Sequence, residues 1–301
     1  MSPVTEKHSF RIAVVGDVHL SFGPADVAHL DAQGFDAILF VGDLSGYMPR
    51  GAHRVARYVR MLKTPTFVIP GNHDTVAAPQ LIAEVMQNET AIQLLGAGQR
   101  GRVEELREAL APAELVGYSL HRLDENLTMI AARPHSFGGP RLSFCPYLSD
   151  AFRVSSLEAS AARLKWLIDD VRDERVIFLA HNGPSGLGDR RDAIWGCDFR
   201  RSEGDFGDPD LEEAITHART KGKRVVAVIA GHMHHALKGR GTRKWIEERS
   251  GTLYVNAARV PRVFKENGRE KRHYVEVVID GEHASAKQVL FSPEIAIERR
   301  S

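Results

Sequence analysis

The sequence predicts an α/β fold, and two observations support this prediction. First, short apolar runs rich in β-branched residues recur along the chain, and continuous runs of this length are typical of strands covered on both faces. Second, stretches with helical signals lie between several of these runs, and such alternation indicates layers of sheet and helix. The runs expected to be strands are residues 11–15, 37–41, 66–69, 127–131, 176–179 and 225–229.

Helical signals mark three stretches between these runs. Residues 49–63 place two valines and a leucine on one face of a helix. Residues 155–171 begin with Ser155 and Glu158 at the spacing of a capping box and continue with an apolar stripe. An Asp-Pro pair is typical of an N-cap followed by proline at the first helical position, and it predicts a helix at about residues 209–221.

The C-terminal part of the chain has a different pattern, in which strand-like runs follow one another directly. Asn-Gly and Asp-Gly dipeptides separate these runs, so we expect a meander or hairpin that completes a second sheet. We expect a single domain over residues 1–301, with insertions or loops around residues 75–117 and 183–207. The expected C-terminal strands are residues 253–255, 274–279 and 287–290.

The composition is that of an ordinary globular protein, with 43% hydrophobic and 26% charged residues in a chain of 301. The 40 basic and 39 acidic residues give a formal net charge of +1, which indicates no general preference for a polyanion or a membrane. Cys145 and Cys197 are too few for a disulfide framework, and they favour a reducing compartment. Because the sequence shows neither a signal-like segment nor an apolar run of ~20 residues, we expect a cytoplasmic protein without membrane contact.

Polar side chains follow five of the expected strands at the point where each strand ends. Ligands of α/β sheets bind at the carboxyl ends of the strands. A single Asp or His in such a place is more often a turn or cap residue, but five coincidences at the same end favour one common site. Crowded carboxylates raise one another's pKa, and a divalent cation removes that conflict. The residues concerned are Asp17, His19, Asp43, Asn72, His73, Asp74, His181, His232 and His234.

The number and type of these groups predict a site for two metal ions. With His73 counted separately, two aspartates, one asparagine and four histidines remain, which is too many ligands for one tetrahedral zinc ion. The set suits two ions about 3.5–4 Å apart that share a bridging carboxylate. Oxygen and imidazole donors without a thiolate suit Mn, Fe or Zn rather than Ca, and the sequence leaves the choice among these three open.

The order of these groups resembles the calcineurin-like metallophosphoesterase superfamily. Its motif blocks are DxH, GD, GNH(D/E), H and GHxH, and all of them occur here in that order between Asp17 and His234. The resemblance implies an αββα sandwich of two mixed β-sheets flanked by helices, which agrees with the strands expected above. It also implies an enzyme that hydrolyses phosphoric esters with two divalent or trivalent metal ions.

The resemblance further implies a role for each matching position. His73 should reach the phosphoryl group or the leaving oxygen without binding metal, and Asp74 should orient its ring. Asp43 should bridge the two ions. The remaining ligands should be Asp17, His19 and His234 for the first ion, and Asn72, His181 and His232 for the second.

Departures from the family pattern indicate which branches of the family the sequence resembles. The GD block continues as Leu-Ser-Gly-Tyr and not into the Asp-Arg-Gly of serine/threonine protein phosphatases, which argues against that branch. Other stretches are similar to a narrower subgroup from cyanobacteria and plant plastids, and this similarity names no substrate. The stretches are residues 132–139, 181–189, 204–211 and 231–235.

These residues predict a metal-dependent phosphoesterase that acts on a small phosphate mono- or diester. Water bridging two cations becomes hydroxide near neutral pH and attacks phosphorus, while His73 stabilises the phosphoryl group or protonates the leaving oxygen. One alternative is a nuclease, but the near-neutral charge disfavours nucleic acid as a partner. Another alternative is a non-catalytic binding module, which should have lost ligands or His73. The sequence leaves the natural substrate, the metals and the oligomeric state open.

A second set of residues is a candidate for binding substrate. Arg190 and Arg191 lie in the stretch after His181 and could bind a phosphate, and Trp195 could stack on a ring. The arginines at 200–201, in the same stretch, could also bind the phosphate. A solvated, charged loop explains all of these residues equally well. His135 could reach the rim of the site, although a simple turn histidine is the more common situation.

Overall fold

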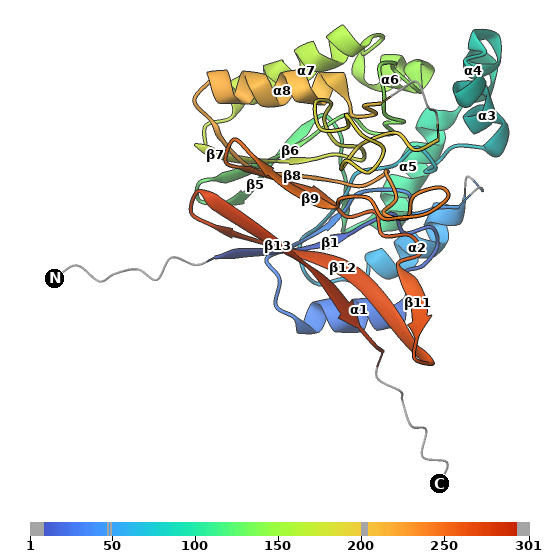
Figure 1. The fold of residues 1–301 in the computed structure, drawn as a ribbon. Helices are drawn as coiled ribbons and strands as arrows, with labels where there is room; N and C mark the ends of the chain where they lie inside the picture. The colour runs from blue at the N-terminus through green and yellow to red at the C-terminus, as the bar shows by residue number, and fades with distance from the viewer. Residues whose placement is uncertain (1–8, 47, 49, 200–203, 294–301) are drawn as a thin grey trace.

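The computed structural model describes residues 9–46, 48, 50–199 and 204–293 (Figure 1). Two β-sheets pack face to face, and helices cover the outer face of each sheet. This arrangement confirms the predicted αββα sandwich of two mixed β-sheets. Within the described part of the chain, no helix is long and apolar enough to cross a membrane.

The first sheet contains seven strands of the described residues, in the order β11-β12-β1-β2-β3-β4, with β13 paired to β12. Strands β1 to β4 are parallel, and β12 runs antiparallel to β1. The parallel strands are β1 (Phe10–Val15), β2 (Ala37–Phe40), β3 (Thr66–Val68) and β4 (Glu114–Leu115). The others are β11 (Val263–Glu266), β12 (Arg269–Asp280) and β13 (His283–Phe291).

The second sheet contains six strands of the described residues, in the order β5-β6-β7-β8-β10-β9. Its four central strands are parallel, and the two edge strands are antiparallel to their neighbours. The central strands are β6 (Leu127–Ala131), β7 (Arg175–Leu179), β8 (Arg224–Ala230) and β10 (Thr252–Asn256). The edge strands are β5 (Ser119–Asp124) and β9 (Ile246–Arg249).

Helices form the outer layers of the sandwich and one projecting lobe (Figure 1). The first sheet is covered by α1 (Pro24–Ala32), α2 (Gly51–Val59) and α5 (Gln99–Leu110). The second sheet is covered by α7 (Leu157–Asp170) and α8 (Pro209–Thr220). The lobe contains α3 (Ala78–Met86) and α4 (Glu89–Gly96), and α6 (Cys145–Phe152) lies next to α4 and α5.

Two apolar clusters hold these layers together. One lies between the sheets, where Ile12 and Val14 of β1 are buried in the same cluster as Met129 of β6 and Ile177 of β7. The other lies between sheets and helices and includes Val55 of α2. Because the parallel strands are apolar on both faces, they contribute residues to both clusters, as their continuous apolar runs predict. Removal of this apolar surface from water is the main force that stabilises the sandwich.

The C-terminal strands differ from the prediction. We expected them to complete a second sheet, but the β12–β13 hairpin extends the first sheet, because Ile12 of β1 pairs with Val277 of β12. Of the expected C-terminal strands, β10 belongs to the second sheet, beside β8. The segment at residues 75–117, expected as an insertion or loop, contains α3, α4 and α5. The helix expected from residue 49 begins at Gly51, and residue 49 itself lies outside the described residues.

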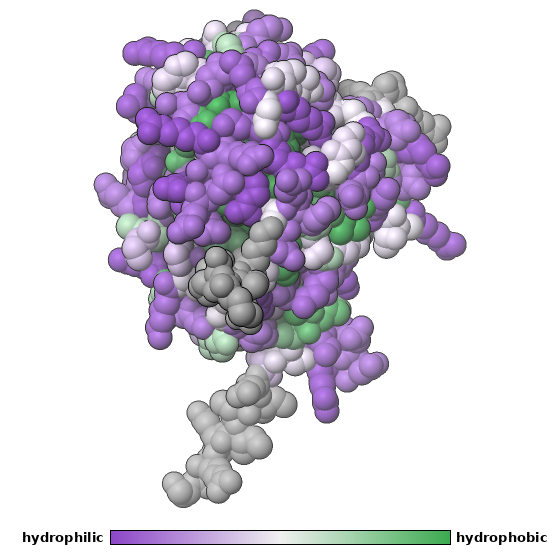
Figure 2. All heavy atoms as spheres, turned by 90° about the vertical axis from the view of Figure 1, so that its left-hand side faces the viewer, coloured by the Kyte–Doolittle hydropathy of each residue, from purple (hydrophilic) through white to green (hydrophobic). Residues whose placement is uncertain are grey.

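The surface at the amino ends of the β1, β7 and β8 strands is mostly hydrophilic. Figure 2 shows this face, where charged and polar side chains surround a few scattered apolar residues. Such a distribution is ordinary for a solvated surface. The polar residues predicted to form the site follow the opposite, carboxyl ends of the strands.

Glu84 of α3 connects the projecting lobe to the segment that precedes α6. Its Oε1 accepts a hydrogen bond of 3.0 Å from the backbone N–H of Phe144. Burial raises the pKa of this carboxyl to about 7, although the hydrogen bond acts in the opposite direction. Since the folded state then binds the proton more tightly than the unfolded state, this group stabilises the protein at low pH. Its contribution disappears as the pH rises through about 7.

Replacement of Glu84 by glutamine removes this titration and keeps an oxygen that can accept the Phe144 hydrogen bond. We therefore expect Glu84→Gln to raise the melting temperature relative to the unsubstituted protein more at pH 8.5 than at pH 5. Thermal unfolding at the two pH values measures this difference. Glu108→Gln, on the exposed face of α5, is the matched control and should shift the melting temperature equally at both. An equal shift for Glu84→Gln would contradict the prediction.

Candidate metal centre

The carboxyl ends of five strands bring the predicted metal ligands together. The loops after β1, β2 and β3 come from the first sheet, and the loops after β7 and β8 come from the second. Among the described residues, two groups of side chains place potential ligand atoms within 4.8 Å of one another. The first group is Asp17, His19 and His234, and the second is Asp43, His181 and His232.

The first group lies where the loop after β1 meets the loop after β8. Nε2 of His234 is 3.3 Å from Oδ2 of Asp17 and 3.4 Å from Nε2 of His19. The Asp17 carboxylate is buried, whereas the His234 side chain is 42% exposed. The group therefore has a buried anionic side and an open side.

The second group lies deeper and includes Asn72. Nε2 of His181 is 2.9 Å from Oδ1 of Asn72 and 3.6 Å from Oδ1 of Asp43. The ring of His232 is next to that of His181, with centroids 5.0 Å apart. Asn72, His181 and Asp43 are all buried, so these donors converge in a volume that side chains enclose.

Asp43 faces both groups with different oxygens. Its Oδ1 is 3.6 Å from Nε2 of His181 in the second group, and its Oδ2 is 3.9 Å from Nε2 of His19 in the first. Oδ1 also accepts a hydrogen bond of 2.9 Å from the backbone N–H of His73. The carboxylate thus lies between the two groups, with one oxygen directed to each.

The hydrogen bonds around His181 test whether this donor set fits a cation. Its Nδ1 lies 2.6 Å from the carbonyl oxygen of Val41, and a carbonyl accepts, so Nδ1 carries the proton. In the neutral ring, the lone pair of Nε2 then points toward the oxygens of Asn72 and Asp43, which are also electron-rich. A cation among these three atoms turns the repulsion into attraction. Metal binding requires this neutral, Nδ1-protonated form of the ring.

Asp17 gives a second, independent indication. Its Oδ1 accepts a hydrogen bond of 3.1 Å from the backbone N–H of His232. Its Oδ2 is buried and lacks a hydrogen bond of acceptable geometry from the described residues, although His234 approaches it to 3.3 Å. A buried carboxylate oxygen without a donor is costly in free energy. The first group therefore also fits a cation.

Burial and neighbouring charges shift the pKa values of the site in both directions: those of His181 and His234 are raised, and those of Asp17 and His232 are lowered. Burial alone would raise the pKa of Asp17, but the adjacent His234, with the other nearby histidines, holds it well below its usual value. Burial, aided by His181, lowers the pKa of His232 to about 3. Asp17 is therefore ionised and His232 neutral at pH 7, which are the forms that bind metal ions.

The backbone of the site is held in close and strained conformations. A Cβ on Gly71 would lie 2.2 Å from Oδ1 of Asp43, so only glycine lets the two loops approach this closely. His19, Asp43 and His232 have φ values of 40°, 49° and 67°, in the left-handed region that non-glycine residues seldom adopt. Such strain is concentrated at functional sites, where the surrounding structure imposes it.

His73 lies at the open side of the centre. Its ring is 5.5 Å from that of His19, centroid to centroid, and it lines the cavity described below. The hydrogen bonds of Asp74 differ from the expectation that its carboxylate orients the His73 ring. Its Oδ1 and Oδ2 each accept a hydrogen bond of 2.9 Å from backbone, Oδ1 from the N–H of Ser45 and Oδ2 from that of Gly71. We therefore assign Asp74 to holding the loop that carries Asn72 and His73.

Sequence reasoning missed two residues that support this arrangement. The hydroxyl of Ser45 donates to the carbonyl oxygen of His73 over 2.5 Å, which connects the loops after β2 and β3. The buried Arg243 donates from Nε to the carbonyl oxygen of His234 over 3.0 Å. Ser45 is the second residue after the GD block, so its position near the site could be read from the sequence. Arg243 lies nine residues beyond His234, and no pattern marks it.

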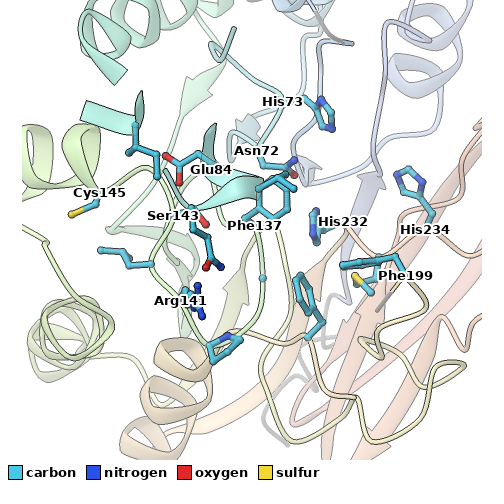
Figure 3. A pocket seen from close by; sticks show the side chains of 18 of the residues that line it. Asn72, His73, Glu84, Phe137, Arg141, Ser143, Cys145, Phe199, His232 and His234 are labelled. Atoms are coloured by element: carbon cyan, nitrogen blue, oxygen red, sulfur yellow. The ribbon is translucent and has the colours of Figure 1, made fainter. Parts of the chain in front are cut away.

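A cavity of about 1090 Å³ opens beside the metal centre (Figure 3). Asn72, His73, His232 and His234 form part of its wall. Figure 3 shows Phe137 beside Asn72 and His232, with Arg141 farther from His73 and His234. Sequence reasoning did not select the rest of the lining, because these residues come from loops and from the α3–α4 lobe without a motif. They include Glu84, Phe137, Arg141, Phe199, Phe206 and Lys238.

The four candidates for substrate binding lie elsewhere, so their predicted role is corrected. Trp195 is fully buried and packs against Gly183, where a Cβ would lie 2.0 Å from its ring. His135 is also fully buried, and its Nδ1 donates to the carbonyl oxygen of Gly71 over 2.9 Å. Neither side chain is available to a substrate. They pack beneath the loops that carry the ligands.

Arg190 and Arg191 are at the surface and do not line the cavity. Arg190 pairs with Asp192 at 3.2 Å, and its side chain is 74% exposed. Arg191 donates to the carbonyl oxygen of Lys238 over 2.8 Å. The solvated-loop alternative therefore describes both. The arginines at 200–201 lie outside the described residues.

The family model for calcineurin-like phosphoesterases matches residues 10–236. The chain belongs to this family. It is therefore a metal-dependent phosphoesterase, an enzyme that hydrolyses phosphoric esters. The matched region includes every strand-end loop described above. No curated protein is significantly similar to the chain in sequence.

Several solved structures resemble this one at low sequence identity. The structure of PhoD covers 94% of this chain and 68% of its own, with 10% identity and a TM-score of 0.53. The protein TT1561 of Thermus thermophilus covers 93% of this chain and 99% of its own, with 13% identity and a TM-score of 0.45. A structure described as a novel archaeal phosphodiesterase covers 93% of this chain and 99% of its own, with 10% identity and a TM-score of 0.42. At such identities, the likeness to PhoD shows a shared fold alone.

Proposed function

We propose that this phosphoesterase hydrolyses a small phosphate mono- or diester at a centre of two metal ions. The observation that carries the proposal is the position of Asp43, whose two oxygens face different groups of potential ligands. Each group contains imidazole nitrogens and buried oxygen atoms, the donor types that suit Mn, Fe or Zn. Asp17, His19 and His234 would hold one ion, and Asn72, His181 and His232 the other, with Asp43 shared.

Two such cations, when bound, supply positive charge to the phosphoryl oxygens and lower the pKa of water. The protein's own part is to position these groups and to move a proton. The close approach of Gly71 to Asp43 and the hydrogen bonds of Asp74 fix the loop on which Asn72 and His73 lie. Fixed geometry of this kind reduces the reorganisation needed during reaction.

His73 is the group that we assign to the leaving oxygen. It lines the cavity beside Asn72 and His232, and its backbone N–H is fixed by Asp43. From this position the imidazole can donate a hydrogen bond to the phosphoryl group and a proton to the departing alkoxide. Phe137, next to His232 with ring centroids 6.0 Å apart, covers the adjacent wall with apolar surface and excludes water there.

The cavity favours a small ester over a nucleic acid. Its lining contains the acidic residues Glu84, Glu89 and Asp198 as well as Arg141 and Lys238. A groove that binds a polynucleotide backbone is predominantly basic. A purely binding role also has less support, because the candidate ligands lie close together and His73 lines the cavity beside three of them.

Metal removal and replacement test the proposal. We expect protein stripped of metal to lose hydrolysis of p-nitrophenyl phosphate and bis-p-nitrophenyl phosphate, and added Mn²⁺ to restore it on at least one ester. Titration should show two Mn²⁺ bound per chain, and the preferred ester separates monoesterase from diesterase action. Binding of a single ion would contradict the dinuclear centre. Two bound ions without hydrolysis of either ester would contradict the proposed reaction on small esters.

A further inference from the structure

The cavity is much larger than the reacting phosphate group requires. Its volume of about 1090 Å³ is slightly above the range of about 300–1,000 Å³ that is common for pockets of drug-sized ligands. The metal ligands occupy one part of the wall, and residues of the α3–α4 lobe, such as Val85 and Ile92, occupy another. The organic part of the ester therefore has its own binding region, and this region can distinguish among esters.

Aromatic rings form a wall beside the metal centre. Phe137 packs edge-on against His232, and Phe199 packs edge-on against Phe206, with centroids 6.0 Å and 4.9 Å apart. Phe199 is 39% exposed although it is a large apolar side chain. Exposed aromatic surface inside a cavity loses contact with water when a flat ring packs on it, and such pairs prefer offset or edge-on geometry.

Arg141 supplies a positive charge to the same cavity. The side chain is exposed and forms no ion pair or hydrogen bond with any part of the chain that the structure describes. In Figure 3 it lies on the far side of Phe137 from His73 and His234. An arginine can bind a carboxylate or phosphate with two parallel hydrogen bonds. A substrate that spans the aromatic wall would bring such a group to it.

The other charges of the cavity leave this role to Arg141. Asp198 is neutralised by Arg243 at 3.2 Å. Lys238 places its ammonium 5.4 Å from the centre of the Phe199 ring, so it already has a favourable contact. Glu84 accepts the hydrogen bond from Phe144, and the exposed Glu89 lies in the first turn of α4. Of the two cations in the described lining, Arg141 is the one that can turn its whole guanidinium group to an anion.

We propose that the cavity selects nucleotide-sized phosphate esters whose organic part contains a flat ring and carries a second anionic group, which Arg141 binds. This proposal rests on the proposed phosphoesterase function. The reacting phosphate lies at the metal centre, the ring packs against the wall of Phe137 and Phe199, and the second anion reaches Arg141. Such a substrate matches the cavity in size, shape and charge.

Calorimetric binding to the Mn²⁺-loaded protein tests the proposal without requiring turnover. Adenosine 3′,5′-bisphosphate and adenosine 3′-monophosphate differ by one phosphate, and propane-1,3-diyl bisphosphate has two phosphates but no ring. Since a charge-assisted hydrogen bond contributes about 1.5–3 kcal/mol, we expect the adenosine bisphosphate to bind about 10-fold or more tightly than the monophosphate. It should also bind more tightly than the ringless bisphosphate.

The variant Arg141→Met keeps the aliphatic stem and removes the charge. It should reduce the preference for the second phosphate to about 2-fold or less, whereas Arg172→Met, an exposed arginine before β7, should leave it unchanged. A preference that persists in Arg141→Met, or is absent from the unsubstituted protein, overturns the role of Arg141. Equal binding of the ringless bisphosphate overturns the role of the ring. Failure of the phosphoesterase proposal can be distinguished from these outcomes, because the protein would then not hydrolyse the nitrophenyl esters.

Discussion

Replacement of Asp43 by asparagine is expected to remove most of the metal and nearly all of the activity. The substitution keeps the size of the side chain but leaves one oxygen where two now face different groups of ligands. An uncharged amide also no longer balances the positive charge of two cations. Because metal ions contribute several kcal/mol of transition-state stabilisation, the rate should fall by about 10³-fold or more.

Metal analysis by mass spectrometry, together with hydrolysis of the nitrophenyl esters, measures both effects on Asp43→Asn. Asp170→Asn, at the exposed end of α7, makes the same chemical change away from the site and should keep both metal and rate. If Asp43→Asn protein retains two ions and an unchanged rate, Asp43 does not bridge the centre. Circular dichroism separates loss of metal from loss of fold.

Replacement of His73 by alanine is expected to lower the rate by about 10²–10⁴-fold while metal content stays the same. His73 lines the open cavity and belongs to neither group of candidate ligands, whereas the proposed ligand His181 is fully buried beside Asp43. Loss of the ring therefore removes a proton donor but no metal ligand. The backbone N–H of residue 73 still donates to Asp43 in the variant.

A comparison of two esters shows whether His73 protonates the leaving oxygen. p-Nitrophenolate leaves without much help from an acid, whereas an alkoxide needs a proton. If His73 protonates the leaving oxygen, the rate loss in His73→Ala should be larger for an alkyl phosphate than for p-nitrophenyl phosphate. An equal loss on both would assign His73 to phosphoryl binding alone. A fall in metal content along with the rate would make it a ligand, against the proposed role.

The strands and the candidate metal ligands could be predicted because both depend on local properties of the sequence. A buried parallel strand needs a continuous apolar run, and the polar group that ends it comes within a few residues, as Val15 and Asp17 show. Chain order then specifies which loops meet, since parallel strands present their carboxyl ends at one edge. Convergence of Asp17 and His234 therefore required no knowledge of side-chain packing.

Other features depend on pairing and burial that the sequence does not display. The β12–β13 hairpin was assigned to the wrong sheet because its turn specifies the hairpin but not the neighbouring strand, which is β1. Trp195, between charged residues, looked exposed, yet its ring fills the space above Gly183. In α5, Val103 and Leu106 are buried at helical spacing, so this signal was available and was overlooked.

The two sheets contribute unequal parts to each group of proposed ligands. In the first group, Asp17 follows β1 of one sheet and His234 follows β8 of the other; in the second, Asn72 follows β3 and His181 follows β7. Neither sheet alone carries a complete coordination sphere. Each metal ion would therefore connect the two sheets of the sandwich. A substitution that shifts one sheet relative to the other should change the metal affinity, even when the substituted residue lies far from the cavity.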